Sequence, residues 1–208
     1  MIKAILFDMD GVLIEAKEWH FEALNKALNH FGHSISKESH VTTFDGLPTL
    51  TKLQMLHESR GLPIGLQPII NKLKQKYTLQ ISSEKCRPSF NHQYAVSKLK
   101  DEGYLMAVCS NSVSKTIDVM LQASGLEKYF SLKISNEDVK KAKPDPEMYL
   151  KAMSVLKISA SECLILEDNE HGIKAALESG AHLMKIGTPD DVTYLNIKNR
   201  IKEIEEKI

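Results

Sequence analysis

The sequence predicts an α/β fold: a Rossmann-like parallel sheet with helices on both faces, plus a helical cap inserted after the first strand. Several short apolar segments are nearly continuous rather than alternating, which is typical of strands buried on both faces. Segments with a helical period lie between the later ones, and this alternation indicates parallel strands joined by helices. Residues from about 16 to 78 carry only helical patterns.

Five strands are expected. The first covers residues 2–7, and the others cover 105–109, a weaker segment 130–134, 164–166 and 183–186. Three helices are expected among the later strands. Their apolar stripes are Val113, Ile117, Met120 and Leu121, ending at Gly125; Met148, Tyr149, Ala152 and Leu156; and Ile173, Ala176 and Leu177, ending at Gly180.

The helical cap is expected over residues 16–78, and the core domain over residues 1–15 and 79–208. The cap is predicted from three apolar stripes with a helical period. They are Trp19, Ala23, Leu24, Ala27, Leu28 and Phe31; then Leu50, Leu53 and Leu56; then Ile69, Ile70, Leu73 and Tyr77. The C-terminal segment IKEIEEKI is rich in charge, so a short solvated helix is expected there.

Composition argues against several classes of function. Lysine plus arginine and aspartate plus glutamate each number 27, so no positive excess favours binding to nucleic acid or to an anionic membrane. No apolar stretch approaches the roughly 20 residues of a membrane-spanning helix, and the N-terminus does not resemble a signal peptide. The three cysteines are isolated, which favours reduced thiols in a cytoplasmic protein. A monomer or homodimer is expected.

Polar side chains follow three of the expected strands at the point where each strand ends. In an open parallel sheet, the carboxyl ends of the strands form the crevice where ligands bind. Residues far apart in the sequence are therefore expected to meet at one edge. They are Asp8 and Asp10 after the first strand, Ser110 and Asn111 after the second, Glu167 and Asp168 after the fourth, and Lys143 from the loop before the fourth.

These residue types are the ones that phosphoryl transfer needs. Carboxylates offer hard oxygen ligands suited to Mg²⁺, and the serine, asparagine and lysine can hold phosphate oxygens. Catalysis of phosphoryl transfer rests mainly on positioning and on neutralisation of charge. A carboxylate can also attack phosphorus and form an aspartyl phosphate. The set therefore predicts a site for phosphoryl transfer, with Mg²⁺ as the suited metal.

The sequence resembles the haloacid dehalogenase superfamily over essentially its whole length, in the phosphatase and β-phosphoglucomutase-like branch that has a helical cap. Four motifs carry the resemblance: DMDGVL, VCSNS, KAKPDPEMY and LILEDNEHGIKAA, in this order and each behind the expected kind of element. The resemblance implies a Mg²⁺-dependent phosphatase with an aspartyl-phosphate intermediate. It also implies a small phosphorylated metabolite as substrate, with a sugar or polyol phosphate as the expected class.

The resemblance further implies a role for each matching residue. Asp8 would be the nucleophile, and Asp10 would protonate the leaving alcohol and then activate water. Mg²⁺ would be held by Asp8, by the main-chain carbonyl of Asp10 and by Asp168, with Glu167 in support. The residues expected to bind phosphate or substrate are Ser110, Asn111 and Lys143 from the core, and His20, Gly46 and Thr49 from the cap.

The sequence departs from the family pattern in three places. Glu15 and Ala16 stand where a hydroxyl side chain is frequent, and Asn169 replaces a frequent serine. The turn 46–49, which reads GLPT, lacks the arginine with which phosphomutases of this branch hold a second phosphate. This last departure argues against mutase activity.

Two alternative functions remain open at this point. The first is a β-phosphoglucomutase-like sugar phosphomutase, which would need a second phosphate site. The second is a non-enzymatic phospho-receiver or binding module, because receivers also combine acids with a lysine on a parallel sheet. Receivers are shorter and lack a helical insertion after the first acidic strand end. Hydrolysis of a chromogenic phosphate ester would distinguish the enzyme from the module.

Overall fold

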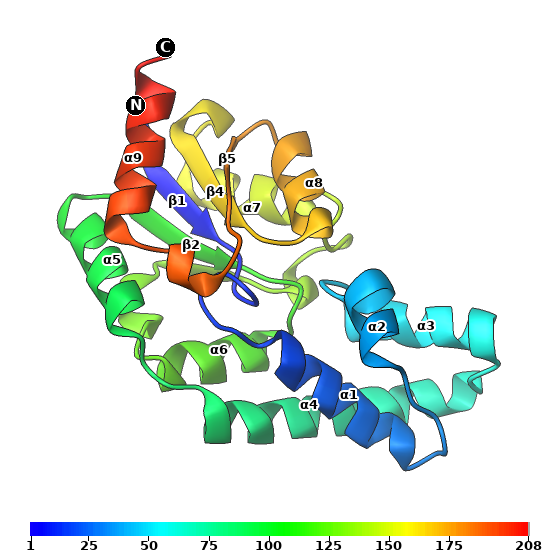
Figure 1. Cartoon of the computed structure of the whole chain (residues 1–208). Helices are drawn as coiled ribbons and strands as arrows, with labels where there is room; N and C mark the ends of the chain where they lie inside the picture. The colour runs from blue at the N-terminus through cyan, green and yellow to red at the C-terminus, as the bar shows by residue number, and fades with distance from the viewer. Residues whose placement is uncertain (208) are drawn as a thin grey trace.

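The computed structural model describes residues 1–207; Ile208, the last residue of the expected C-terminal helix, lies outside the described residues. Five parallel strands form one sheet in the order β3-β2-β1-β4-β5 (Figure 1). They are β1 Ala4–Phe7, β2 Leu105–Cys109, β3 Leu132–Ile134, β4 Cys163–Glu167 and β5 His182–Lys185. All five expected strands are confirmed, with small shifts at their ends.

The register of the central strands brings their carboxyl ends level with one another. Phe7 at the end of β1 pairs with Val108 of β2 and with Leu166 of β4. The residues that follow β1, β2 and β4 therefore emerge side by side at one edge of the sheet, where the polar residues are expected to meet.

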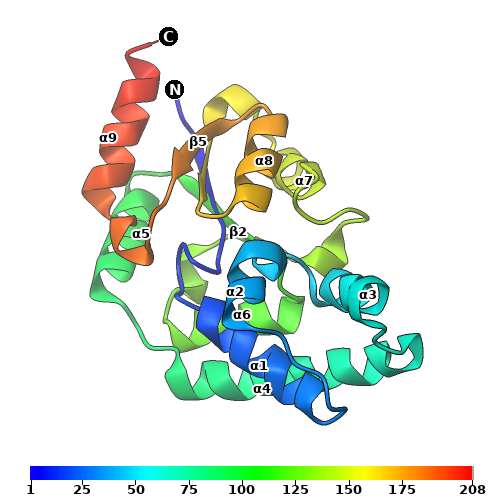
Figure 2. The ribbon, with the colours of Figure 1, turned by 45° about the vertical axis from the view of Figure 1, so that its right-hand side comes forward.

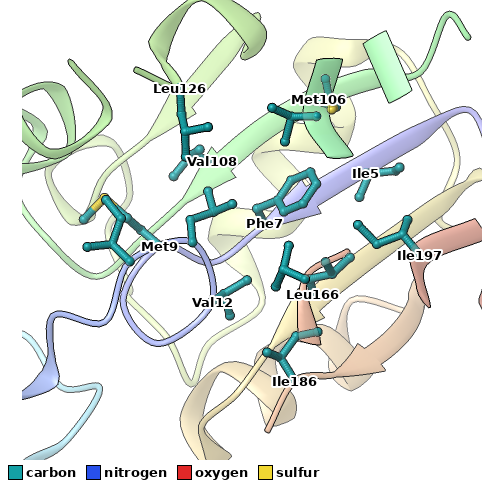
Figure 3. Packing of buried hydrophobic residues seen from close by; sticks show 14 of the residues in the cluster. Ile5, Phe7, Met9, Val12, Met106, Val108, Leu126, Leu166, Ile186 and Ile197 are labelled. Carbon is teal, nitrogen blue, oxygen red and sulfur yellow. The ribbon is translucent and has the colours of Figure 1, made fainter. Parts of the chain in front are cut away.

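Helices cover both faces of the sheet, as expected. Ile5 and Phe7 contribute to a hydrophobic cluster with α5 Phe90–Asp101, α6 Ser114–Ala123 and α9 Tyr194–Glu205, and Figure 3 shows part of this packing. Leu6 contributes to a second cluster with α7 Glu147–Leu156 and α8 Glu170–Glu178. Because successive strand residues point to opposite faces, two covered faces require apolar side chains at every position.

The helices between β1 and α5 form a separate group, called here the helical lobe (residues 17–85). It contains α1 Lys17–Asn29, the short α2 Lys37–Ser39, a π-helical turn His40–Phe44, α3 Thr49–Arg60 and α4 Gln67–Lys85, and no β-strand. Leu24, Leu28, Leu53 and Ile70 belong to its own hydrophobic cluster. Figure 1 places the lobe beside the sheet end to which the arrowheads of β1 and β2 point, and Figure 2 shows α1 and α4 side by side within the lobe.

The expected domain limit at residue 78 stays a prediction. Helix α4 continues through this position to Lys85, because no glycine or proline interrupts the sequence between Pro68 and Pro88. Short 3₁₀ turns complete the described structure at Ile64–Leu66, Glu127–Tyr129, Asn136–Asp138, Ala160–Glu162 and Pro189–Asp191. No helix within residues 1–207 is both long enough and apolar enough to cross a membrane.

Two helices present different faces from those expected. Leu50 is exposed, because the buried face of α3 consists of residues spaced three and four apart: Thr49, Lys52, Leu53 and Leu56. Helix α9 begins at Tyr194, before the segment IKEIEEKI, and Ile201 and Ile204 of this segment are buried in the first hydrophobic cluster. The prediction of a short solvated helix is therefore wrong, since one side of α9 belongs to the core.

Candidate active site

The first motif places two acids in a tight turn directly after β1. The main-chain N–H of Asp8 donates to the carbonyl of Leu166, 3.0 Å away, which continues the sheet register by one residue. Gly11 has a φ of +93°, and a Cβ atom at this position would lie 2.1 Å from Oδ2 of Asp168. Only glycine therefore fits the turn in its approach to Asp168.

Lys143 lies at the centre of the buried part of the site. Its ammonium contacts Oδ1 of Asp8 at 2.6 Å and Oε1 of Glu167 at 2.7 Å, and it donates to the carbonyl of Cys109 at 2.7 Å. The hydroxyl of Tyr149 donates to the same oxygen of Glu167. All four charged or phenolic side chains are buried, so their positions are set by these contacts rather than by solvent.

The buried cluster of Asp8, Glu167 and Lys143 contains two acidic side chains and one basic side chain, so its charges are not balanced. Burial raises the pKa of Asp8 well above its usual value; Lys143 opposes this effect, and the neighbouring acids add to it. Burial lowers the pKa of Lys143, but contact with Asp8 and Glu167 outweighs burial and raises the pKa. An additional positive charge beside Asp8 would stabilise its ionised form.

A set of three acids could hold such a charge. Asp8, Glu167 and Asp168 each offer one carboxylate oxygen, and these oxygens lie within 4.8 Å of one another. Hard oxygen donors of this kind fit Mg²⁺. Oε1 of Glu167 already accepts from Lys143 and Tyr149, which suits a supporting role. Asp168 forms an ion pair with Lys17 at 2.7 Å.

Asp10 belongs to a second cluster of polar contacts, which reaches into the helical lobe. Ser112 donates to its Oδ2 at 2.9 Å, and the hydroxyl of Ser110 lies 3.5 Å from the same oxygen. Nε2 of His20 lies 3.1 Å from its Oδ1, and Nδ1 of His20 lies 3.2 Å from the ammonium of Lys74. When Lys74 is protonated it can only donate, so Nδ1 then accepts and the proton of the neutral ring is on Nε2, on the side of Asp10.

The pKa values in this second cluster follow from the same contacts. Burial raises the pKa of Asp10, but His20, Ser112 and Lys74 together outweigh burial and lower it below its usual value. Burial and the charge of Lys74 lower the pKa of His20, against the opposite effect of Asp10. At neutral pH, Asp10 is therefore a carboxylate beside a neutral imidazole.

Asn111 joins the lobe to the core. Its amide nitrogen donates to the carbonyls of Gly46 at 2.8 Å and Lys143 at 3.0 Å, and its oxygen accepts from the main chain of Lys143 at 3.0 Å. Both donor hydrogens are used, so the side chain supports the site and has no donor left for phosphate. A Cβ atom at Gly46 would lie 2.8 Å from Oδ1 of Asn169, so the turn approaches the core closely at this position.

One cavity of about 50 Å³ lies between the lobe and the sheet edge. It brings together eight of the ten residues expected from the sequence, whereas Glu167 and Asp168 lie behind its wall in contact with Lys143 and Lys17. The eight are Asp8, Asp10, His20, Gly46, Thr49, Ser110, Asn111 and Lys143.

Several polar residues of the site are not among those expected from the sequence. Lys52 and Lys74 line the cavity from the lobe, and Ser112 contacts Asp10. A signal for the lysines was present: Lys74 follows Ile70 by four residues, and Lys52 precedes Leu56 by four, so each falls in an apolar helical stripe. A lysine at such a position is buried unless the helix is rotated away from its neighbours.

Comparison with known proteins agrees with this geometry. The family model of haloacid dehalogenase-like hydrolases matches residues 5–186. The chain belongs to this family. This haloacid dehalogenase-like hydrolase is 26% identical over 179 residues to a phosphorylated carbohydrates phosphatase of Thermotoga maritima, covering 86% of this chain and 82% of the relative. It is 25% identical over 198 residues to the pyrophosphatase PpaX of Bacillus mycoides, covering 89% and 83%.

The fold is shared with solved structures of the family. The β-phosphoglucomutase of Clostridium difficile superposes with a TM-score of 0.85 at 19% identity and covers 98% of both chains. The prediction of an enzyme is confirmed: the chain is a haloacid dehalogenase-like phosphatase of phosphorylated compounds. The non-enzymatic alternative is therefore set aside.

Proposed function

We propose that the enzyme hydrolyses a small phosphate monoester through phosphorylation of Asp8. The observation that carries this proposal is the pair of carboxylates on one turn with different surroundings. Asp8 contacts the ammonium of Lys143, whereas Asp10 contacts His20 and Ser112. Asp8 thus lies among groups that can bind a phosphoryl group, and Asp10 lies among groups that can take part in proton transfer.

In the first half of the reaction, a carboxylate oxygen of Asp8 attacks phosphorus and the bond from phosphorus to the leaving oxygen breaks. Lys143 and the hydroxyl of Ser110 hold the phosphoryl oxygens. The leaving oxygen takes a proton from Asp10, which leaves an alcohol and an aspartyl phosphate. The negative charge of the bound phosphate raises the pKa of Asp10 and so favours its protonated form in the complex.

In the second half, a water molecule attacks the phosphorus of the aspartyl phosphate. Asp10, now a carboxylate, takes a proton from this water. The bond between phosphorus and Asp8 breaks, which releases inorganic phosphate and restores the Asp8 carboxylate. Asp10 gives this proton up when phosphate leaves and takes one up again when the next ester binds, so protons balance over the cycle.

The donor set supports Mg²⁺ as the cofactor. Asp8, Asp168 and the main-chain carbonyl of Asp10 would hold it, with Glu167 supporting Lys143 and the acids. When bound, Mg²⁺ would neutralise charge on the phosphoryl oxygens and on the acid cluster. The raised pKa of Asp8 supports this assignment, since burial, with a smaller effect of the neighbouring acids, disfavours the carboxylate that a bound cation would stabilise.

A sugar or polyol phosphate is the substrate class that we propose. The cavity is small, and side chains that can bind hydroxyl groups line its lobe side, among them Thr49 and Gln75. A relative named a phosphorylated carbohydrates phosphatase supports this class. The cytoplasmic location, together with a monomeric or homodimeric state, stays a prediction.

The test is turnover of a chromogenic phosphate ester by Asp8→Asn. This variant is expected to lose activity by several orders of magnitude, because an amide cannot attack phosphorus. Asp101→Asn, at an exposed position on α5, is the matched control and is expected to keep full activity. Near-wild-type turnover by folded Asp8→Asn would refute the assignment.

A further inference from the structure

Two buried lysines face the cavity from the helical lobe. Lys52 on α3 is 5% exposed and Lys74 on α4 is 7% exposed, and both line the cavity that also contains Asp8 and Ser110. Lysines are almost never fully buried unless they are paired. Their position in the wall of an active-site cavity therefore requires an explanation.

Neither lysine has an anionic partner in the part of the chain that the structure describes. Within residues 1–207, neither ammonium lies within 4.0 Å of a carboxylate oxygen, and the hydrogen-bond partner of Lys74 is the neutral ring of His20. Lys143 provides the comparison. It is also buried in the wall of this cavity, yet it contacts both Asp8 and Glu167. The positive charge of Lys143 is thus balanced within the protein, and the charges of the two lobe lysines are not.

The absence of an anionic partner makes the protonated forms of Lys52 and Lys74 unfavourable. Burial lowers the pKa of Lys52 to about 8, and burial together with the charge of Lys52 lowers the pKa of Lys74 to about 7. Asp10 and, for Lys52, Asp45 oppose this lowering without cancelling it. An anion that enters the cavity would supply the missing negative charge and would favour the protonated form of both lysines.

Both lysines line the cavity from lobe helices, whereas Lys143 and Ser110 line it from the core. His20 stands between Lys74 and Asp10, so Lys74 is on the far side of the imidazole from the proposed proton donor. The transferred phosphoryl group is held on the core side by Lys143 and Ser110. A neighbouring cavity of about 390 Å³ gives further room for a leaving group. The residues that line both cavities are Thr49, Gln75, Val113 and Asn136.

Resting on the proposed function, we propose that Lys52 and Lys74 form a subsite for a second anionic group, a carboxylate or a second phosphate, on the leaving alcohol of the substrate. Lys52 lies in the first turn of α3, directly after the turn 46–49 that lines the same cavity. The preferred substrate is then a phosphate ester of an acid sugar or polyol, or a bisphosphate.

The test compares three esters of equal chain length: propyl phosphate, the phosphate ester of 3-hydroxypropanoate, and propane-1,3-diol bisphosphate. The wild-type kcat/KM is expected to be about tenfold to a hundredfold higher for at least one of the two doubly anionic esters than for propyl phosphate. The ratio between the two doubly anionic esters identifies the second group as a carboxylate or a phosphate.

The variants Lys52→Met and Lys74→Met are expected to lose most of this preference, and Lys52→Arg to retain part of it. Lys76→Met, at an exposed position on α4, is the matched control and is expected to keep the wild-type ratio. Circular dichroism confirms that each variant is folded before its ratio is interpreted.

Equal kcat/KM for the three esters, or a preference unchanged in Lys52→Met, would overturn the subsite while leaving the proposed hydrolysis in place. Hydrolysis of a chromogenic ester without hydrolysis of either doubly anionic ester would also overturn it. If no phosphate ester is hydrolysed, the proposed function itself fails, and the subsite fails with it.

Discussion

Replacement of Lys52 by methionine is expected to stabilise the protein at neutral pH. Methionine has a similar length, and it can fill the same buried space without a charge. Burial lowers the pKa of Lys52 from the ordinary value of 10.5 to about 8. Because one pKa unit corresponds to about 1.4 kcal/mol, the protonated lysine lowers the free energy of unfolding by on the order of 3 kcal/mol.

The same pKa values set the pH dependence of this gain. Between about pH 8 and 10.5, the unfolded chain binds more protons at Lys52 than the folded protein does, so this group makes wild-type stability rise with pH. The penalty is fully present below about pH 8 and disappears as the pH approaches 10.5. At pH 9.5, the charge-dependent part of the gain is expected to fall to about 1.4 kcal/mol.

Urea unfolding at pH 7 and pH 9.5, followed by the fluorescence of Trp19 and by circular dichroism, measures the gain in unfolding free energy at each pH. Equal m-values for the two proteins would permit direct comparison of their unfolding free energies. Lys76→Met is again the control and is expected to change stability little at either pH. A Lys52→Met protein that is less stable than wild type at pH 7, or whose gain is the same at both pH values, would refute the reasoning.

Three further predictions concern the core of the site. Tyr149→Phe removes the hydroxyl that donates to the buried Glu167 and should lower the free energy of unfolding by about 1–3 kcal/mol in urea titrations; an unchanged value would contradict this contact. Gly46→Ala would place a Cβ atom 2.8 Å from Asn169 at a φ of +72° and should reduce kcat/KM by about tenfold, with an unchanged circular dichroism spectrum. Wild-type kcat/KM in Gly46→Ala would show that the turn is not held against Asn169 during turnover. Chelation should abolish turnover and Mg²⁺ should restore it, whereas activity that survives exhaustive chelation would exclude the proposed metal role.

The sheet and the acidic edge could be predicted from the sequence for a physical reason. A strand covered on both faces needs apolar residues at nearly every position, so segments such as 105–109 have few other interpretations. Parallel strands share one carboxyl edge, and residues that follow them must therefore approach one another. This is why Asp8, Ser110 and Asp168 could be placed together although about a hundred residues separate the first two.

The residues that line the site from the helical lobe could not be predicted in the same way. Leu50 and Leu53 suggested one apolar stripe on α3, but the helix is rotated so that Lys52 is buried and Leu50 is exposed. Helix periodicity alone is compatible with either rotation, and packing against α4 and in the hydrophobic cluster of the lobe decides between them. The network of His20 and Lys74 likewise joins residues from two helices, and no spacing within the sequence encodes it.

The central claim is that Asp8 carries the phosphoryl group during turnover. The enzyme would be mixed with excess phosphate ester, quenched in acid within milliseconds and digested, and its peptides would be analysed by mass spectrometry. The account predicts a phosphate on the peptide that contains Asp8, present in Asp101→Asn and absent in Asp8→Asn. Release of inorganic phosphate with no phosphorylated peptide, or phosphate on a residue other than Asp8, would contradict it.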